Sequence, residues 1–312
     1  MTARRGSRRG GKPSLATRFF LFLAIVTGAL VAAAYWVGGA IERHADAVAE
    51  EDCAIHARLA ASVADEHVSG LGLGLEAAAD NPRLAAACRV RDIETARTLL
   101  RRLVSLSGRF DRVFLADTAG VEWCDYPQDS RVAGKSFAYR QWYRWVRSTN
   151  ERYVSPRYAR AAGKHEPAIA IAVPVDGLGG KPGAYLVAQV LVSSIEQGVK
   201  RTSESWKGTI RLFDRAENYL VPQTPDSAMV IGRQLHDLIA VARKTGGTAR
   251  GRLGKGEVVL AVADAPSFGG IAVATMTSDD IADQARRITR RYRNAALIGG
   301  AAVSILALVL LR

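Results

Sequence analysis

Two long apolar stretches without a charged residue lie near the ends of the chain, and they constrain its fold more than any other feature. The first runs from Phe19 to Ile41 and the second from Asn294 to Leu311. At a rise of about 1.5 Å per residue, each is long enough to cross or nearly cross a hydrocarbon layer of about 30 Å. The pattern predicts a transmembrane helix over 19–41, a folded segment over 42–293 and a second transmembrane helix over 294–311.

The charges beside the first stretch indicate its orientation. The tail 1–18 is basic, no acidic residue occurs before Glu42, and acidic residues cluster directly after the stretch. Cytoplasmic flanks carry an excess of Lys and Arg, so we expect a cytoplasmic N-terminus and a periplasmic or extracellular folded segment anchored in the inner (cell) membrane. The 23-residue apolar run is longer than the core of a signal peptide, which favours an uncleaved anchor over a cleaved signal peptide.

The net charge of +13 raises nucleic acid as a partner. However, the basic residues gather in the tail and between Arg286 and Arg293, beside the two apolar stretches. That placement favours contact with the lipid bilayer, and we expect no nucleic acid partner.

Three cysteines, Cys53, Cys88 and Cys124, leave at least one thiol unpaired. None has the spacing of a redox or metal motif. A bridge between Cys88 and Cys124 stays open, and small buried thiols are the favoured interpretation.

Helical periodicity continues beyond the first stretch. Val48, Ile55, Leu59 and Val63 fall on one face of a long helix. We expect this helix to fade near the glycines of 70–74 and to stop by Asn81-Pro82. A second helix is predicted over 91–107.

The pattern then changes to short extended runs separated by turn residues, as in antiparallel sheets. A first group predicts one sheet with a helix over 139–147 packed across it, and its strands are expected at 112–116, 121–124, 167–175 and 184–192. After a helix over 193–203, a weaker copy of this plan has a helix over 232–244 and strands expected at 209–213, 218–221, 252–264 and 269–276. A last helix starts at Ser278. The fold class is therefore α+β, with two modules in tandem.

The order and spacing of four segments resemble the double Cache family of bacterial extracytoplasmic sensors, whose modules are PAS-like. These segments are FDRVFLADTAG at 110–120, RQWYRWV at 140–146, YVSPRY at 153–158 leading into AIAIAVPV at 168–175, and GAYLVAQV at 183–190. The resemblance implies a membrane-distal ligand module over about 90–195. It also implies a membrane-proximal module over about 205–277 that relays a signal to the second transmembrane helix.

Within that family, the branch that binds amino acids carries an Arg-x-Trp-Tyr element, which is present here as Arg140, Trp142 and Tyr143. A guanidinium offers two parallel donors to a carboxylate, and the rings supply a dry wall. The alternative is an amphipathic helix whose Trp and Tyr are core residues and whose Arg is solvated. Tyr158 and Gln189 complete the predicted ligand site.

Three family positions that surround the ligand differ in this chain. Gln189 aligns with an Asp that receives the ligand's ammonium group, Arg160 stands where that branch often has another Asp, and Lys135 stands near a missing Tyr. The resemblance therefore implies that carboxylate recognition is kept and ammonium recognition is lost. We expect a small organic anion rather than an amino acid, with an amino-acid-binding sensor of the same fold as the alternative.

No catalytic motif occurs, and the five histidines show no metal-ligand spacing. We therefore expect no enzyme activity, no catalytic residue, no cofactor and no metal. Two functions remain: a signalling receptor, which we expect to form a homodimer and to use a separate cytoplasmic output protein or a missing C-terminal domain, and a membrane-tethered binding protein that does not signal.

Overall fold

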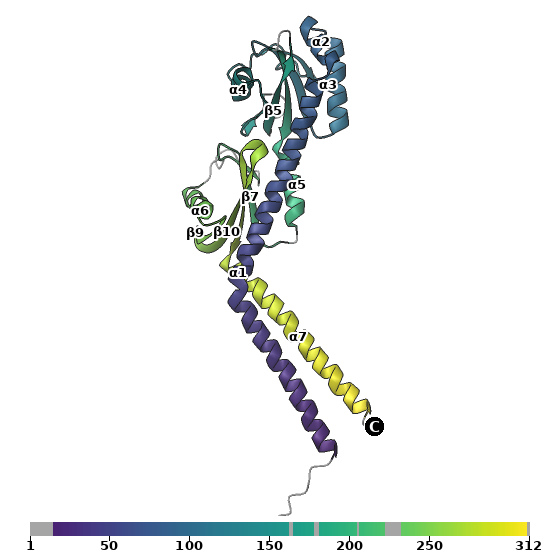
Figure 1. Ribbon diagram of the computed structural model, residues 1–312, viewed down its shortest axis with the longest axis vertical. Helices are drawn as coiled ribbons and strands as arrows, with labels where there is room; N and C mark the ends of the chain where they lie inside the picture. Colours follow the sequence, from purple (N-terminus) through teal and green to yellow (C-terminus); the bar gives the residue numbers. More distant parts are fainter. Residues whose placement is uncertain (1–14, 162–164, 178–180, 205, 222–231, 311–312) are drawn as a thin grey trace, which may run out of the picture. The chain divides into compact units, whose positions relative to one another are not determined.

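The structure is a computed structural model, and it describes residues 15–161, 165–177, 181–204, 206–221 and 232–310 (Figure 1). The chain forms two compact units. One contains residues 1–48 and 279–312, and the other contains residues 49–278. The second unit holds both β-sheets.

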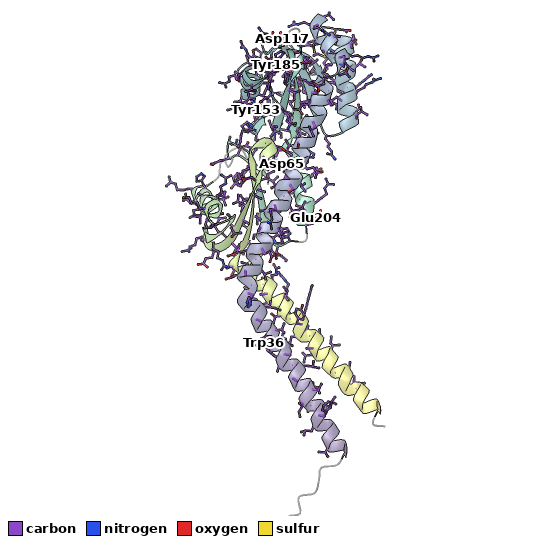
Figure 2. All side chains as sticks on the ribbon, viewed as in Figure 1. Trp36, Asp65, Asp117, Tyr153, Tyr185 and Glu204 are labelled. Atoms are coloured by element: carbon purple, nitrogen blue, oxygen red, sulfur yellow. The ribbon has the colours of Figure 1, made fainter. Side chains whose placement is uncertain are left out.

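The first unit is helical. It contains the start of α1 (Leu15–Ala79) and nearly all of α7 (Ser278–Leu310). Within α1, the segment Leu21–Ile41 has a mean hydropathy of 2.0 and is long and apolar enough to cross a membrane. Its side chains face outward, as Trp36 does with 71% exposure (Figure 2). Outward apolar side chains are what a lipid-facing helix presents.

The second expected span, 294–311, is helical as far as Leu310. Residue 311 and many of the span's side chains lie outside the described residues. Within the described part of the chain, no second helix segment meets the same length and hydropathy criteria. The two-span topology therefore stays a prediction.

The first sheet is antiparallel and has its strands in the order β2-β1-β6-β5-β3, with β4 also paired to β5. The bounds are β1 (Arg112–Asp117), β2 (Glu122–Tyr126), β3 (Tyr153–Val154), β4 (Tyr158–Ala159), β5 (Pro167–Asp176) and β6 (Pro182–Leu191). β5 and β6 are almost continuously apolar and buried. Such runs indicate a strand whose two faces are both covered.

Helices cover both faces of this sheet (Figure 1). On one face, Val113 and Leu115 pack against α1, α2 (Pro82–Val90) and α3 (Ile93–Ser107). On the other face, alternate residues such as Phe114 pack against α4 (Gln141–Thr149). The two-residue period of the strand therefore sends neighbouring side chains into two separate cores.

The second sheet has the order β8-β7-β11-β10-β9 and is also antiparallel. Its elements are β7 (Thr209–Phe213), β8 (Tyr219–Val221), α6 (Arg233–Lys244), β9 (Thr248–Leu253), β10 (Gly256–Ala265), a 3₁₀ turn (Pro266–Phe268) and β11 (Gly270–Thr277). α6 covers one face. On the other face, Leu212 and Leu220 join the hydrophobic cluster that also contains α1, α5 (Val192–Ser203) and the first sheet. One core thus continues along α1 from sheet to sheet.

Two sequence-based boundaries are corrected. The expected strand 252–264 is two strands, β9 and β10, which a two-residue turn joins at Gly254, where φ is +65°. The long helix does not fade near its glycines but runs to Ala79. The long helix stops before Asn81-Pro82, as expected, and an additional short helix follows it: Asn81 caps α2 by accepting a hydrogen bond from the Arg83 backbone N–H at 2.9 Å, and Pro82 takes the first helical position.

Candidate functional site

The candidate site is built where α4 begins. Arg140 has an extended backbone, with φ −73° and ψ 144°, and immediately precedes the helix. Trp142, Tyr143 and Val146 face the sheet and are buried. Burial of these apolar side chains against the sheet fixes the position of α4, and with it the position of Arg140 at the start of the helix.

Aromatic rings flank the Arg140 guanidinium. Its central carbon lies 4.6 Å from the ring centroid of Tyr158 and 5.0 Å from that of Tyr139. Both distances are in the range of cation–π contacts. Among the residues that the structure describes, Arg140 has neither a carboxylate partner nor a side-chain hydrogen bond.

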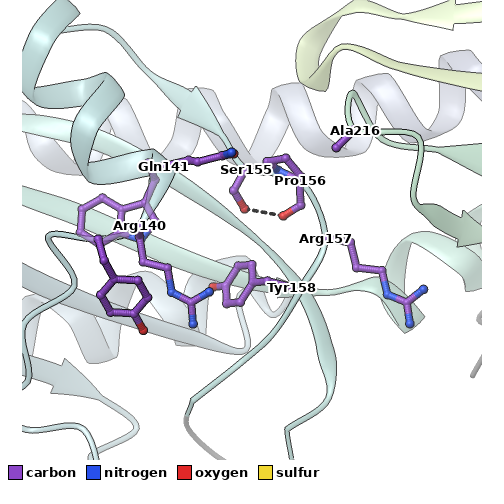
Figure 3. A pocket seen from close by; sticks show the side chains of 9 residues that line it. Arg140, Gln141, Ser155, Pro156, Arg157, Tyr158 and Ala216 are labelled. Atoms are coloured by element: carbon purple, nitrogen blue, oxygen red, sulfur yellow. Dashed lines mark hydrogen bonds between the residues drawn. The ribbon is translucent and has the colours of Figure 1, made fainter. Parts of the chain in front are cut away.

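Arg140 lines a cavity of about 320 Å³. Figure 3 shows this cavity, whose lining residues are Tyr139, Arg140, Gln141, Trp142, Ser155, Pro156, Arg157, Tyr158 and Ala216. None of them is acidic. Arg157 extends away from Arg140 in Figure 3, and its Nη1 donates to the Tyr219 carbonyl at 2.9 Å. A neighbouring cavity of about 600 Å³ shares Gln141, Pro156 and Ala216 and is also lined by Arg144 and Arg215.

A much smaller cavity of about 10 Å³ is lined partly by the same side chains. It shares Arg140, Trp142 and Tyr158 with the 320 Å³ cavity, which is called the large cavity below. It is also lined by Gln189 and Arg112. Gln189 is 5% exposed, and its Nε2 donates to Tyr158 Oη at 3.0 Å. Gln189 Oε1 is buried and has no hydrogen-bond partner among the described residues. Burial raises the pKa of Tyr158 to about 12, although the Gln189 hydrogen bond and the nearby Arg140 charge act to lower it.

Four of the five predicted site residues come together here: Arg140, Trp142, Tyr158 and Gln189. Tyr143 does not line either of these two cavities. Its ring packs edge-on against Trp142, with ring centroids 6.0 Å apart, and against Tyr185, and its Oη donates to the Thr118 carbonyl at 2.8 Å. In this structure Tyr143 holds α4 onto the sheet.

The two substituted family positions outside the strands are also placed. Arg160 forms ion pairs with Asp111 and Glu166, and it does not line the two cavities. Lys135 is exposed, and its backbone N–H donates to the Val132 carbonyl. Neither residue supplies an acceptor for an ammonium group.

Sequence reasoning missed a buried charge cluster behind Gln189. Arg112 Nη2 donates to Glu122 Oε1 and, at 2.8 Å, to Asp125 Oδ2. Desolvation raises the pKa of Glu122 to about 7, against the lowering effect of the Arg112 charge. Sequence reasoning also missed Tyr139 as a site residue, although an aromatic residue next to Arg140 was a signal for it. The cluster had no local signal, because it depends on the pairing of β1 with β2 and β6.

The described residues contain no group of three or more His, Cys, Asp or Glu placed to hold a metal ion. All three cysteines are buried and unpaired by disulfides. The cavity is therefore basic and aromatic, and the Arg140 guanidinium and the Tyr158 phenol can donate hydrogen bonds to an anion.

Comparisons with known proteins identify the fold. No family model matches the chain, and no curated protein matches it. Among solved structures, the ligand-binding domain of the Pseudomonas aeruginosa PAO1 amino acid chemoreceptor PctB, in complex with L-Gln, superposes with a TM-score of 0.59 at 20% identity, over 74% of this chain and 92% of that one.

Two other chemoreceptor domains are similar to the same extent. That of Pseudomonas fluorescens CtaA with L-isoleucine has a TM-score of 0.58 at 18% identity and covers 79% of this chain and 98% of that one. That of Campylobacter jejuni Tlp3 with L-valine has a TM-score of 0.58 at 16% identity and covers 77% and 97%. All three are ligand-binding domains of chemoreceptors. The two sheets along the long helix thus confirm the resemblance, and the chain has the fold of a double Cache sensor domain.

Proposed function

We propose that this chain is a membrane-anchored extracytoplasmic sensor whose distal module, at about 90–195, binds a small carboxylate-bearing ligand. The proximal module, at about 205–277, would relay binding to a second transmembrane helix at 294–311. The basic tail 1–18 supports a cytoplasmic N-terminus, and the apolar segment Leu21–Ile41 supports the first span.

The observation that carries the proposal is the state of Arg140. Its guanidinium contacts the rings of Tyr139 and Tyr158, and Arg140 lines a cavity that has no acidic lining residue. Ring faces accept no conventional hydrogen bond from the guanidinium, so its N–H groups are left to find an acceptor. A carboxylate matches these donors with two parallel hydrogen bonds. Tyr158 adds a phenol that carries its proton at neutral pH, and burial raises its pKa further, to about 12.

The same cavity favours an anion over an amino acid. An ammonium group removed from water needs acceptors or a negative charge, and the ionisable lining residues of the large cavity are Tyr139, Arg140, Arg157 and Tyr158. The ligands bound in the three similar domains are amino acids. An amino-acid sensor is therefore the second candidate, and the two candidates differ in what happens to the ammonium group.

A direct connection between the sheets supports the relay. The loop between β3 and β4 lines the cavity with Ser155, Pro156 and Arg157. The Arg157 backbone N–H donates to Asp214 Oδ2 at 2.6 Å, and Asp214 follows β7 of the second sheet. A ligand that moves this loop would act on the second sheet through that hydrogen bond, by shifting the population between two states. Signalling would further require a homodimer and an output protein or domain.

The proposal is tested by calorimetric titration of the full chain in detergent micelles with monocarboxylates, dicarboxylates and amino acids. Ligand at 100 times its dissociation constant adds about 2.7 kcal/mol of stability, so a thermal-shift screen finds the binders first. We expect Arg140→Gln to weaken carboxylate binding about 30-fold or more. Arg102→Gln, which removes an exposed charge from α3, is the matched control.

Three results would count against it. Equal affinities for wild type and Arg140→Gln would remove Arg140 from the site. Binding of amino acids but of no organic acid would favour the second candidate. A fusion of residues 1–312 to a known output module that stays silent with every bound ligand would favour a tethered protein that does not signal.

A further inference from the structure

The buried carbonyl oxygen of Gln189 indicates what the ligand carries next to its carboxylate. Gln189 lies within β6, opposite Arg112 of β1 and Ala170 of β5. Its amide nitrogen already donates to Tyr158 Oη, whereas Oε1 is buried without a partner among the described residues. A buried acceptor without a donor costs about 1–3 kcal/mol, so a group that donates one hydrogen bond is favoured there.

The space beside Gln189 sets the size of that group. The small cavity has a volume of about 10 Å³, which is close to the minimum for one water-sized group. Arg140, Trp142 and Tyr158 line both this cavity and the large one. Because these three side chains border both spaces, we infer that a ligand whose carboxylate is bound by Arg140 places one small substituent near Gln189.

The charges around the small cavity select the chemistry of the substituent. Arg140 and Arg112 both line it. The nearby carboxylates of Glu122 and Asp125 accept hydrogen bonds from Arg112 Nη2. An ammonium group would face two guanidinium groups and one neutral carbonyl oxygen, and it would be desolvated without a full negative charge beside it. A hydroxyl group carries no charge and donates one hydrogen bond.

We propose that the ligand is a 2-hydroxy carboxylate, with its carboxylate on Arg140 and its hydroxyl group donating to Gln189 Oε1. The inference rests on the proposed carboxylate site and narrows its ligand class. Tyr158 fits this arrangement because its oxygen accepts from Gln189, which leaves its own proton to donate to the ligand.

The test uses sets of compounds that differ only in the group at carbon 2. One set is L-lactate, propionate and L-alanine. A second is L-2-hydroxy-4-methylpentanoate, 4-methylpentanoate and L-leucine, and a third is L-malate, succinate and L-aspartate. Each is titrated into the full chain in detergent micelles. In the set that binds most tightly, we expect the hydroxy acid to bind about 5- to 100-fold more tightly than the compound without the hydroxyl group, and more tightly than the amino acid.

Two variants test the role of Gln189 itself. Gln189→Leu removes the amide oxygen and the amide nitrogen and keeps a side chain of similar size. We expect the affinity ratio between hydroxy acid and unsubstituted acid to fall to about 1. Gln189→Asp supplies a negative charge, and we expect it to shift the preference from the hydroxy acid toward the amino acid. Gln234→Leu is the matched control, because Gln234 is exposed on α6 and lines neither of these two cavities. The Gln234→Leu ratio should equal that of wild type.

The outcomes separate this inference from the proposed function. Equal binding of hydroxy and unsubstituted acids by wild type would mean that the ligand's hydroxyl group does not donate to Gln189 Oε1. That result would overturn the inference and leave the proposed carboxylate site intact. Tightest binding of the amino acids would overturn it as well. Binding of no compound in any set would overturn both proposals. If Gln189→Asp fails to fold, the Gln189→Leu ratio decides.

Discussion

Glu122 gives the sharpest prediction about stability. Its side chain is 1% exposed, and desolvation raises its pKa from 4.5 to about 7. A carboxylate whose pKa is higher in the folded state binds a proton more tightly there than in the unfolded chain. Its contribution to the free energy of unfolding is therefore fully present below about pH 4.5 and is lost as the pH rises through 7.

The magnitude follows from the same difference. Each pH unit corresponds to about 1.4 kcal/mol, so ionisation of Glu122 lowers the free energy of unfolding by up to about 3 kcal/mol at alkaline pH. Glu122→Gln keeps the size and the acceptor for Arg112 but cannot ionise. We expect the variant to match wild type at about pH 5 and to exceed it at about pH 8. For a unit of this size, about 2–4 °C per kcal/mol converts that gain into about 6–12 °C in Tm.

The assay is thermal melting of wild type and Glu122→Gln in detergent micelles across that pH range. Glu94→Gln is the control, because Glu94 is 87% exposed and pairs with Arg97 at the surface. A Tm difference between wild type and Glu122→Gln that is the same at both ends of the range would refute the reasoning, since Glu122 would then keep one charge state throughout.

Two further predictions concern the sheets and the thiols. Asp214→Ala removes the buried acceptor for the backbone N–H groups of Arg157, Ala216 and Asn218. We expect Asp214→Ala to lower the free energy of unfolding by about 3 kcal/mol or more. The control Asp237→Ala changes an exposed residue and should leave the Tm nearly unchanged. Equal Tm values for Asp214→Ala and wild type would contradict the prediction. Burial raises the pKa of Cys53 and Cys124 to about 12 and that of Cys88 to about 11. A maleimide should therefore modify all three thiols only after unfolding, and labelling of the native protein at neutral pH would show that one is accessible.

The elements of the fold were largely predictable because each has a local signal. The apolar runs of β5 and β6 and the helical period of α3 reflect what each segment buries. Local signals failed where a tertiary contact decides. The glycines of α1 indicated a break, yet the helix continues, and at Gly72 a side chain would meet Arg152 Nη1 at 2.7 Å. The glycine there permits a close approach that only the folded chain reveals.

The site was predictable only in part, for a related reason. The motif identified Arg140 and Trp142, but successive helical residues differ in direction by about 100°, so the motif alone could not say which ring lines the cavity. Tyr143 points into the core and bonds Thr118 instead. The positions of Gln189 and Arg112 relative to Arg140 depend on strand register, which a single sequence does not specify across so many residues.

The arginines near the cavity differ in whether the protein supplies acceptors for their N–H groups. Arg112 is bonded to two buried carboxylates, Arg160 is paired with two others, and Arg157 donates to a backbone carbonyl. Each positive charge withdrawn from water has thus been given acceptors by the fold. Arg140, within the described residues, has only ring faces beside it. These cation–π contacts stabilise the charge, but they leave its N–H groups without an acceptor among the described residues. The fold supplies acceptors to these neighbours, and none of the described residues supplies one to Arg140, so this contrast is what supports the proposal that a ligand does.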